Sequence, residues 1–307
     1  MKSSLAFTVR RARSALTISD LRLTNLDKIF FPERGLTKGD LLAYYETVAP
    51  ALLAHLRGRA IVMKRYPDGV AGPSFYMKRT PKPHPAWLQT CTIEHASGNV
   101  IDFPVIADLP SLLWIVNLGC IDLHPWYGTC DDVNRPDALH FDLDPAEGAT
   151  FATVCEVALL VRKELAGRGF PCYAKTSGST GIHIAVPIVR GPRQKDVWSF
   201  AKAFARELEK RYADLVTSEY RVTRRPLGHV LIDYNQNAWG RTLASVYSVR
   251  PVPRATVSTP VTWEEIERGI STDDFDIETV PRRIDRLGDL WKPMCAPEGR
   301  ARLEVAS

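Results

Sequence analysis

Residues 138–145 read Ala-Leu-His-Phe-Asp-Leu-Asp-Pro, an apolar run that predicts a β-strand ending in two carboxylates. Side chains two apart on a strand project from one face, so Asp142 and Asp144 point the same way, about 7 Å apart. Phe141 and Leu143 then face the core. Two such carboxylates repel each other unless a cation lies between them or one takes a proton. The pattern therefore predicts a Mg²⁺ or Mn²⁺ site on a buried strand, although Asp-x-Asp also occurs at solvated strand ends.

A second apolar strand is predicted to end in a carboxylate, within His-Val-Leu-Ile-Asp-Tyr at 229–234. If Asp233 lies beside the first pair, three carboxylates can hold two cations about 4 Å apart, which can flank an in-line phosphoryl displacement. Asp233 is equally suited to cap the turn at 235–237. The residues alone leave both interpretations open.

The segment 175–183 reads Lys-Thr-Ser-Gly-Ser-Thr-Gly-Ile-His and is rich in small residues whose backbone N–H groups can approach an anion. Such a stretch predicts an anion-binding nest, and His183 at its end can donate to a phosphate oxygen. It is not a Walker A loop, because it lacks the Gly-Lys-Ser/Thr ending and leads into a strand. A plain hairpin turn fits the same residues.

Cations are concentrated in two further regions. Arginines near Asp233 suit the oxygens of a triphosphate, namely Arg221, Arg224, Arg225, Arg241 and Arg250. Between residues 57 and 82, seven Lys or Arg residues, including Lys64 and Arg65, are opposed by one acid and interleaved with Tyr66, Phe75 and Tyr76. This mixture predicts a nucleic-acid groove. Solvated surface arginines and a solvated edge hairpin are the alternatives.

The 307 residues carry 40 Lys and Arg against 35 Asp and Glu, a net charge of +5, and 45% are hydrophobic. These proportions exclude disorder, collagen and coiled coil, and no apolar run approaches the ~20 residues of a membrane-spanning helix. The six cysteines show no CxxC spacing, so we expect free thiols in the reducing cytoplasm. Residues 1–17 are basic and are interpreted as a lead-in to the first strand rather than as a transit peptide.

The predicted helices and strands do not follow strict βαβ order, which indicates an α+β fold around an antiparallel or mixed sheet. Helices are predicted at 37–56, where Thr37 and Asp40 resemble a capping box, and at 112–118, 150–165 and 194–212. Strands are predicted at 60–65, 74–78, 120–123, 138–144, 172–176, 182–188 and 230–234. An amphipathic segment at 281–291 is expected to pack back onto the body.

Six motifs occur in one order: Leu-Thr-Asn-Leu-Asp-Lys at 23–28 through Thr37-Lys38, His-Pro-Trp at 124–126, Phe-Asp-Leu-Asp-Pro at 141–145, Thr-Ser-Gly at 176–178 through His183, Ile-Asp-Tyr-x-Gln-Asn at 232–237, and Tyr-Ser-Val-Arg at 247–250. Together they resemble the polymerase domain of bacterial ATP-dependent DNA ligase D, of the archaeo-eukaryotic primase superfamily. The resemblance covers about residues 18–294. It implies a primase-polymerase fold and a template-directed nucleotidyltransferase. Such an enzyme adds nucleotides, often ribonucleotides, to a primer 3′-OH at gaps or breaks bearing a 5′-phosphate, as in non-homologous end joining.

The family pattern, carried over residue by residue, implies three groups of site residues. Two divalent ions, Mn²⁺ or Mg²⁺, would be held by Asp142, Asp144 and Asp233. The incoming NTP or dNTP would be bound by His124, Ser177, His183, Gln236 and Arg250. DNA would be bound by Lys28 and Lys38 on the 5′-phosphate and by Phe75 and Tyr76 on template bases, within the basic groove that includes Lys64 and Arg65.

Thr180 departs from the family pattern, since members usually carry Lys there. Loss of that cation is expected to weaken triphosphate binding by about 1–3 kcal/mol unless Lys175 or a nearby arginine compensates. A non-catalytic module that binds 5′-phosphorylated ends is the alternative function, and a different Asp-x-Asp enzyme such as a glycosyltransferase is a third.

The resemblance also implies which partners the protein has and where in the cell it acts. Its partners would be DNA with a 5′-phosphate, a Ku-like protein and an ATP-dependent DNA ligase. The protein would act at the nucleoid in the cytoplasm, and no membrane partner is expected. The domain is expected to span 18–294, followed by a tail at 295–307. The chain would be either a free-standing primase-polymerase or a domain of a larger ligase.

Overall fold

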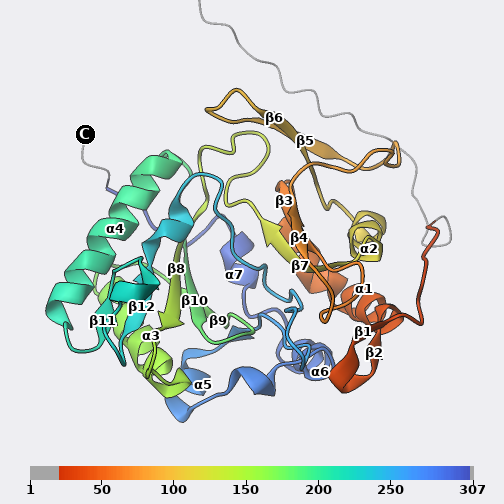
Figure 1. The fold of residues 1–307 in the computed structure, drawn as a ribbon. Helices are drawn as coiled ribbons and strands as arrows, with labels where there is room; N and C mark the ends of the chain where they lie inside the picture. The colour runs from red at the N-terminus through yellow and green to blue at the C-terminus, as the bar shows by residue number, and fades with distance from the viewer. Residues whose placement is uncertain (1–20, 305–307) are drawn as a thin grey trace, which may run out of the picture.

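The computed structural model describes residues 21–304 and is organised around a six-stranded sheet of order β11-β12-β8-β10-β9-β13 (Figure 1). Its strands are β8 (Ala138–Pro145), β9 (Tyr173–Thr176), β10 (Ile182–Pro187), β11 (Val216–Thr217), β12 (Val230–Asp233) and β13 (Pro260–Val261). All its pairings are antiparallel except that of β11 with β12. The sheet is therefore mixed, as the sequence predicted.

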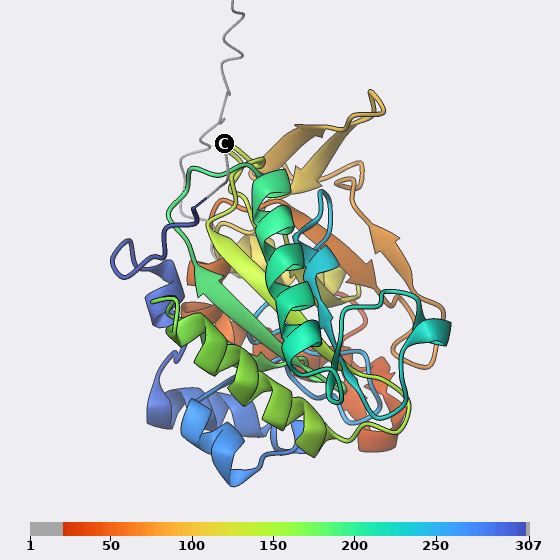
Figure 2. The ribbon, with the colours of Figure 1, turned by 90° about the vertical axis from the view of Figure 1, so that its left-hand side faces the viewer.

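Two long helices cover one face of this sheet, α3 (Phe151–Ala166) and α4 (Gln194–Arg211) (Figure 2). Thr150 caps the start of α3 through the Thr153 N–H. The Phe141 ring of β8 packs 4.9 Å from the Phe204 ring of α4. Because Phe141 faces the helices, the alternating Asp142 and Asp144 face the other side of the sheet.

The N-terminal half holds a three-stranded sheet of order β4-β3-β7, from β3 (Ile61–Arg65), β4 (Phe75–Met77) and β7 (Cys120–Pro125). It is accompanied by α1 (Lys38–Leu56), α2 (Leu109–Asn117), the pair β1 (Ile29–Phe31) and β2 (Leu36–Thr37), and the hairpin β5 (Thr90–Glu94) and β6 (Val100–Pro104). Figure 1 shows this half, in red to yellow, beside the half built on the six-stranded sheet. One hydrophobic core continues through both halves.

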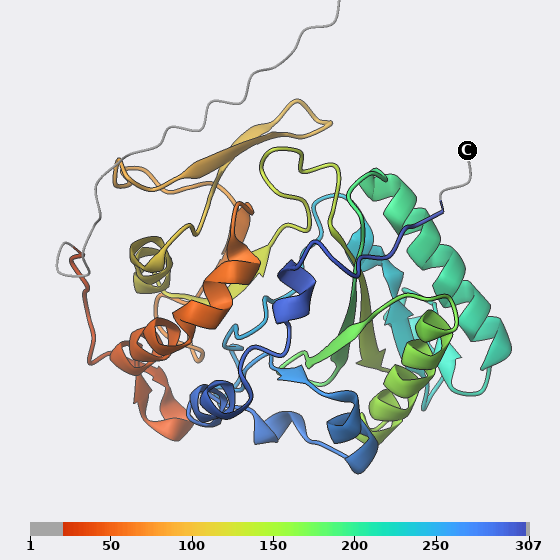
Figure 3. The ribbon, with the colours of Figure 1, turned by 180° about the vertical axis from the view of Figure 1, so that it is seen from behind.

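The C-terminal segment returns to the N-terminal half. Its helices are α5 (Trp263–Arg268), α6 (Thr279–Leu287) and α7 (Lys292–Cys295), and both α6 and α7 contact α1. Figure 3 shows α7 between the two halves. The expected return of residues 281–291 to the body is thereby confirmed. Short 3-10 turns fill the connections at η2 (Pro32–Arg34), η3 (Val222–Arg224), η4 (Tyr234–Asn237) and η5 (Thr272–Asp274).

The predicted helices and strands are all present, with ends shifted by a few residues, and the capping box of Thr37 and Asp40 is confirmed. One correction concerns His124, which was placed after a strand at 120–123 but lies within β7, because that strand extends to Pro125. The hairpin β5–β6 and helix α5 were not predicted. Residues 1–17 lie outside the described residues. Among those described, no helix is both long and apolar enough to cross a membrane.

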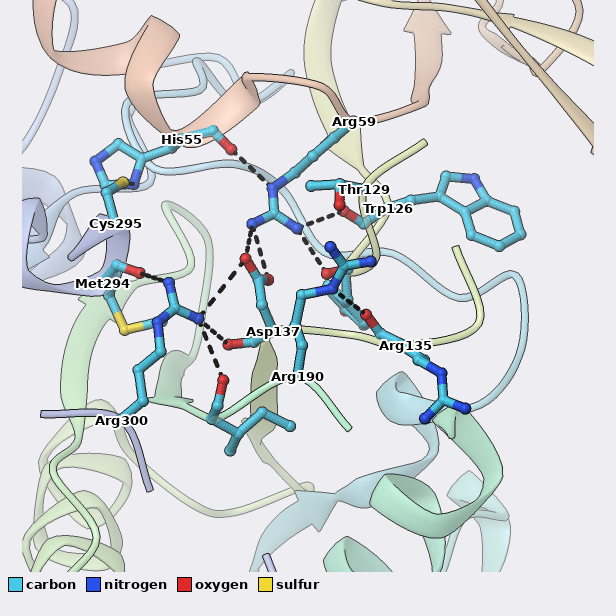
Figure 4. A network of polar contacts seen from close by, with 12 residues as sticks. His55, Arg59, Trp126, Thr129, Arg135, Asp137, Arg190, Met294, Cys295 and Arg300 are labelled. Carbon is cyan, nitrogen blue, oxygen red and sulfur yellow. Dashed lines mark hydrogen bonds and ion pairs between the residues drawn. The ribbon is translucent and has the colours of Figure 1, made fainter. Parts of the chain in front are cut away.

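Asp137, the residue before β8, joins three distant segments (Figure 4). Its carboxylate accepts from Arg59 Nη2 at 2.8 and 2.7 Å, and Arg59 lies just after α1. Its backbone carbonyl accepts from Arg300 Nη1 at 3.1 Å, from the C-terminal segment. This cluster ties the N-terminal half and the C-terminal segment to the start of the strand that carries Asp142 and Asp144.

We predict that Asp137→Asn lowers the free energy of unfolding by about 2–3 kcal/mol, because it leaves the half-buried Arg59 without its bidentate partner. Urea unfolding measures the change. Asp131→Asn is the matched control, since Asp131 pairs with Arg190 at an exposed position and should cost less than about 1 kcal/mol. Equal losses for the two variants would contradict the structural importance of the Asp137 cluster.

Candidate active site

Four polar side chains form one row across four adjacent strands of the central sheet. The register pairs Asp233 of β12 with Asp142 of β8, Asp142 with His183 of β10, and His183 with Lys175 of β9. Residues directly opposite in antiparallel strands share a face, with Cβ atoms about 4.5–5.5 Å apart. Asp144 lies on the same face, two residues after Asp142. The three carboxylates from distant parts of the sequence are therefore brought together.

The pKa values of all three carboxylates are raised, by burial and, for Asp144 and Asp233, by repulsion from Asp142. Burial raises the pKa of Asp142 to about 6, against the opposing effect of Lys175 and Arg250. Repulsion from Asp142 is the largest cause for Asp144, followed by burial and Asp233, and its pKa rises to about 7. Burial and Asp142 also raise the pKa of Asp233. Ionisation of these carboxyls is therefore unfavourable in the folded protein unless a further cation is present.

The donor atoms of the site fit a divalent cation in their chemistry. Asp142 Oδ1 is buried and makes no hydrogen bond, although His183 Nε2 lies 3.1 Å away. A buried acceptor in this state is costly unless a donor or cation reaches it. Oxygen ligands of this type suit Mg²⁺ and Mn²⁺. Within residues 21–304, no three His, Cys, Asp or Glu side chains form a ready-made metal cluster, so the fit rests on donor type and register.

Asp233 also caps the turn that follows it. Its Oδ1 accepts from the Asn235 N–H at 2.8 Å, and its Oδ2 accepts from Gln236 Nε2 at 2.8 Å. Asp233 therefore lies beside the first carboxylate pair and also caps the turn. The strand pairing sets the position of Asp233, the cap fixes its orientation, and Gln236 is held beside the carboxylates.

His183 is oriented from behind by Lys175. The Lys175 Nζ lies 2.6 Å from His183 Nδ1 and also donates to the Ser258 hydroxyl. Burial, aided by Lys175 and Arg250, lowers the pKa of His183 well below its usual range, so the ring is neutral. Burial also lowers the pKa of Lys175, but an amine can donate in either charge state. A neutral imidazole that accepts at Nδ1 carries its proton on Nε2, the atom that faces the carboxylates.

The loop at 177–181, between β9 and β10, folds tightly beside the carboxylates. Ser177 Oγ accepts from the backbone N–H groups of Ser179 and Gly181 at 3.1 and 3.0 Å. Gly178 has a φ of +69°, and a Cβ there would lie 2.5 Å from the Arg250 side chain. A Cβ on Gly181 would collide with the backbone of β8 at Leu143. Only glycine permits this close approach of loop and strand.

Asp122 is a site residue that the sequence analysis missed. It is only 1% exposed, and its Oδ2 lies 3.1 Å from His124 Nε2 and 3.4 Å from Arg250 Nε. Burial opposes its ionisation, but Arg250 and His124 outweigh burial and lower its pKa well below the usual range. Asp122 thus links two residues expected at the nucleotide. The available signal was the alternation along the strand, where Asp122 and His124 are two residues apart.

Thr180 is exposed, and Lys175 does not take the place of the missing cation because it lies beneath His183. Arg250 is the cation in contact with the loop, since its Nη1 donates to the Ser177 carbonyl at 2.8 Å. Arg225 acts at longer range and lowers the pKa values of all three carboxylates. The other arginines expected near the triphosphate are exposed to solvent, namely Arg221, Arg224 and Arg241.

The basic and aromatic residues of β3 and β4 divide between two faces. Lys64 pairs with Tyr76 and Arg65 with Phe75, and the cations lie 5.5 and 5.3 Å from the ring centres. The Tyr76 ring is 6.0 Å from His124, which places Lys64 and Tyr76 on the side of the carboxylate site. Neighbouring residues of a strand point to opposite faces. Phe75 and Tyr76 are both exposed, but they do not form one continuous stacking surface.

Lys28 and Lys38 lie together at the β1–β2 hairpin. Lys38 is 4% exposed, and its Nζ donates to the Thr24 carbonyl at 2.7 Å and to Asn117 Oδ1 at 2.8 Å, neither of which is anionic. Burial and the neighbouring Lys28 lower the pKa of Lys38 to about 8. Lys28 pairs with Asp68 at 2.5 Å. A buried ammonium bonded only to neutral oxygens favours an added anion.

Comparison with known proteins matches residues 37–291 to the family described as LigD, primase-polymerase domain. The chain belongs to this family. It is 33% identical over 278 residues to the multifunctional non-homologous end joining protein LigD of Mycolicibacterium smegmatis. The matched region covers 90% of this chain and 36% of that protein. It is 30% identical to the bifunctional non-homologous end joining protein LigD of Bacillus subtilis, over 87% of this chain and 43% of that protein.

The fold is shared with a solved structure, the polymerase domain from Mycobacterium tuberculosis Ligase D in complex with DNA. The TM-score is 0.85 at 33% identity, covering 90% of this chain and 98% of that one. The chain spans little more than a third of the length of the mycobacterial LigD relatives that it matches. Membership in the LigD primase-polymerase family confirms the predicted fold. It supports a nucleotidyltransferase rather than a non-catalytic module or an unrelated Asp-x-Asp enzyme.

The raised pKa of Asp144 leads to a prediction on stability. The Asp144 carboxyl loses its proton at a higher pH in the folded protein than in the unfolded protein. Its stabilising contribution to the free energy of unfolding is therefore complete below about pH 4 and is lost as the pH rises through about 7. Without divalent ions, Asp144→Asn should be more stable than wild type at pH 8 by on the order of 2 kcal/mol. The difference should vanish near pH 4. Urea unfolding in chelator at both pH values measures it, and a variant less stable at pH 8 would contradict the repulsion.

Proposed function

We propose that this protein is a template-directed repair polymerase that adds ribonucleotides or deoxyribonucleotides to a primer 3′-OH at gaps or breaks bearing a 5′-phosphate. The observation that carries the proposal is the pairing of Asp233 with Asp142 beside the small-residue loop at 177–181. Family membership provides the reaction class. The carboxylates and the loop provide an acidic centre and an anion-binding surface side by side, as phosphoryl transfer requires.

Asp142, Asp144 and Asp233 are the residues that would hold two divalent ions, Mn²⁺ or Mg²⁺. When bound, such ions activate the attacking oxygen and neutralise charge on the phosphates. The unpartnered Asp142 Oδ1 and the raised pKa values of the carboxylates support this assignment. Asp122 is not a candidate ligand, because its Oδ2 faces the Arg250 guanidinium and the His124 ring.

The triphosphate would be bound by residues around the loop. The Arg250 guanidinium and the backbone N–H groups of Gly178 and Thr180 offer donors to its oxygens, since the Ser179 and Gly181 N–H groups already donate to Ser177 Oγ. His183 offers its Nε2–H, with Lys175 fixing the tautomer. His124 and Gln236 flank the same space and would contact the nucleotide. Arg250 already belongs to the family pattern, so it does not by itself replace the cation expected at position 180.

The DNA would lie along the N-terminal half. Lys28 and Lys38 would bind the 5′-phosphate at the far side of a gap, while Lys64 and Tyr76 would contact the strand nearest the nucleotide. Phe75 and Arg65 would reach a different part of the DNA, since they face the other side of the hairpin. The related polymerase domain from Mycobacterium tuberculosis was solved with DNA, which supports a nucleic-acid partner.

Non-homologous end joining is the repair process that fits this chemistry, and it appears in the names of the relatives. A Ku-like end-binding protein and an ATP-dependent DNA ligase are the partners that the role calls for. The reduced cysteines and the DNA substrate point to the cytoplasm, at the nucleoid.

We predict that the protein extends the primer of a gapped, 5′-phosphorylated duplex with Mn²⁺ and ribonucleotides. Gel analysis of labelled primer measures the products. The double variant Asp142→Ala, Asp144→Ala should give only background, because the ions lose their ligands. Asp144→Asn should also be inactive while remaining folded at pH 8. Wild-type extension no greater than that of the double variant would contradict the proposal.

We predict that Lys38→Met reduces the affinity for a gapped duplex with a 5′-phosphate about tenfold, because the variant loses one charged hydrogen bond to that phosphate. The same duplex with a 5′-hydroxyl should bind both proteins alike. Fluorescence anisotropy measures both affinities. Lys78→Met, an exposed lysine of the same half, is the control and should not distinguish the two ends. If Lys38→Met weakened both duplexes by one factor, the 5′-phosphate role would be wrong.

A further inference from the structure

A groove of about 340 Å³ lies between the first turn of α4 and Ala238–Trp239. These two residues follow η4 directly, so the groove begins a few residues after Asp233. Helix α4 packs against η4, and Gln194 Nε2 donates to the Ala238 carbonyl at 3.0 Å. The groove is therefore held at a fixed place relative to the carboxylates.

Two tryptophans give this groove flat walls. Trp239 is 41% exposed, and its ring packs nearly perpendicular to Trp126, with the ring centres 5.2 Å apart. Trp198 donates from its indole N–H to Asn235 Oδ1 at 3.1 Å. Both rings are thus held by the fold before any ligand arrives. Trp239 is the exposed ring of the two, since Trp198 is half-buried and Lys202 Nζ lies 4.7 Å from its ring centre. An exposed aromatic ring in a fixed position is a platform on which an unpaired base stacks.

Gln194 adds an unsatisfied acceptor to the same groove. The residue is 4% exposed, and its Oε1 is buried without a hydrogen-bond partner. An acceptor in this state is costly to the free protein. A ligand that brings an N–H donor into the groove would remove that cost. The exocyclic amino groups of cytosine, adenine and guanine are donors of this kind.

The rim of the groove is positively charged. Arg193 and Lys195 line it and are exposed. The acid in the first turn of α4, Asp196, is occupied in accepting from the Arg193 backbone N–H at 3.0 Å. Nearby Asp131 is paired with Arg190. Cations beside stacking platforms match the phosphates and bases of a single strand.

We propose that this groove is a second nucleic-acid contact, which holds an unpaired nucleotide of single-stranded DNA at the start of α4. The base stacks on Trp239, its amino group donates to Gln194 Oε1, and its phosphate meets Arg193 and Lys195. The inference rests on the proposed function, because a repair polymerase meets ends that carry single-stranded overhangs.

The test compares binding of a short oligo(dC) to wild type and to Trp239→Ala by fluorescence anisotropy. The variant should bind about tenfold more weakly, since stacking on one ring is lost. An abasic oligonucleotide of the same length should bind both proteins equally. Gln194→Leu should weaken oligo(dC) more than oligo(dT), because thymine has no exocyclic amino group. Lys195→Ala should weaken all three probes, whereas Lys210→Ala, at the other end of α4, should weaken none.

Equal binding of oligo(dC) by wild type and Trp239→Ala would overturn the proposal, as would an equal loss with the abasic probe. The same preparations are assayed for primer extension on a duplex with a single-nucleotide gap and no overhang, where Trp239→Ala should keep wild-type activity. Failure of the wild-type protein to extend the primer would overturn the proposed polymerase function. The oligonucleotide comparison would still report on the groove, so the two failures are distinguishable.

Discussion

The site depends on one transverse row of the central sheet, in which Lys175, His183, Asp142 and Asp233 occupy directly opposed positions on four strands. Opposed like charges in antiparallel strands are unfavourable, and burial increases that cost. The register is nevertheless fixed, because a slip of one residue would move the apolar face of β8, including Phe141, away from the helices. Packing on one face thus enforces electrostatic repulsion on the other, and a cation bound there would relieve it.

Two kinds of buried carboxylate define this centre. Asp122 lies beside the Arg250 guanidinium and the His124 ring, and its pKa is depressed, so it is an anion that orients both groups. The carboxylates of the row are not balanced in this way, and their pKa values are raised. The opposite pKa shifts separate Asp122, which orients the residues expected at the nucleotide, from Asp142 and Asp144, which would hold ions. Arg250 bridges the two groups, since it contacts both Asp122 and the loop at Ser177.

Much of this arrangement was predictable from local sequence, but its register was not. The alternation around Asp142 and Asp144 and the cap at Thr37 are local signals, and the structure confirms the shared face of the two carboxylates and the cap. The small residues at 177–181 form the tight turn between two strands that the sequence allowed, and their anion-binding role stays a prediction. The order of motifs identified the family. That Asp233 pairs with Asp142, and that Lys175 lies behind His183, depends on strand pairing over long sequence separations. The hairpin β5–β6 was missed, and no local motif marked Asp122 as the partner of a distant arginine.

The most direct test of the central claim is a crystal structure of the protein with Mn²⁺ and a non-hydrolysable nucleoside triphosphate, with the ions located by their anomalous scattering. The structure described here predicts manganese peaks bound by Asp142, Asp144 and Asp233, with the triphosphate against the loop at 177–181 and Arg250. Peaks found only elsewhere, or an Asp233 carboxylate turned away from a metal bound by the other two, would contradict it.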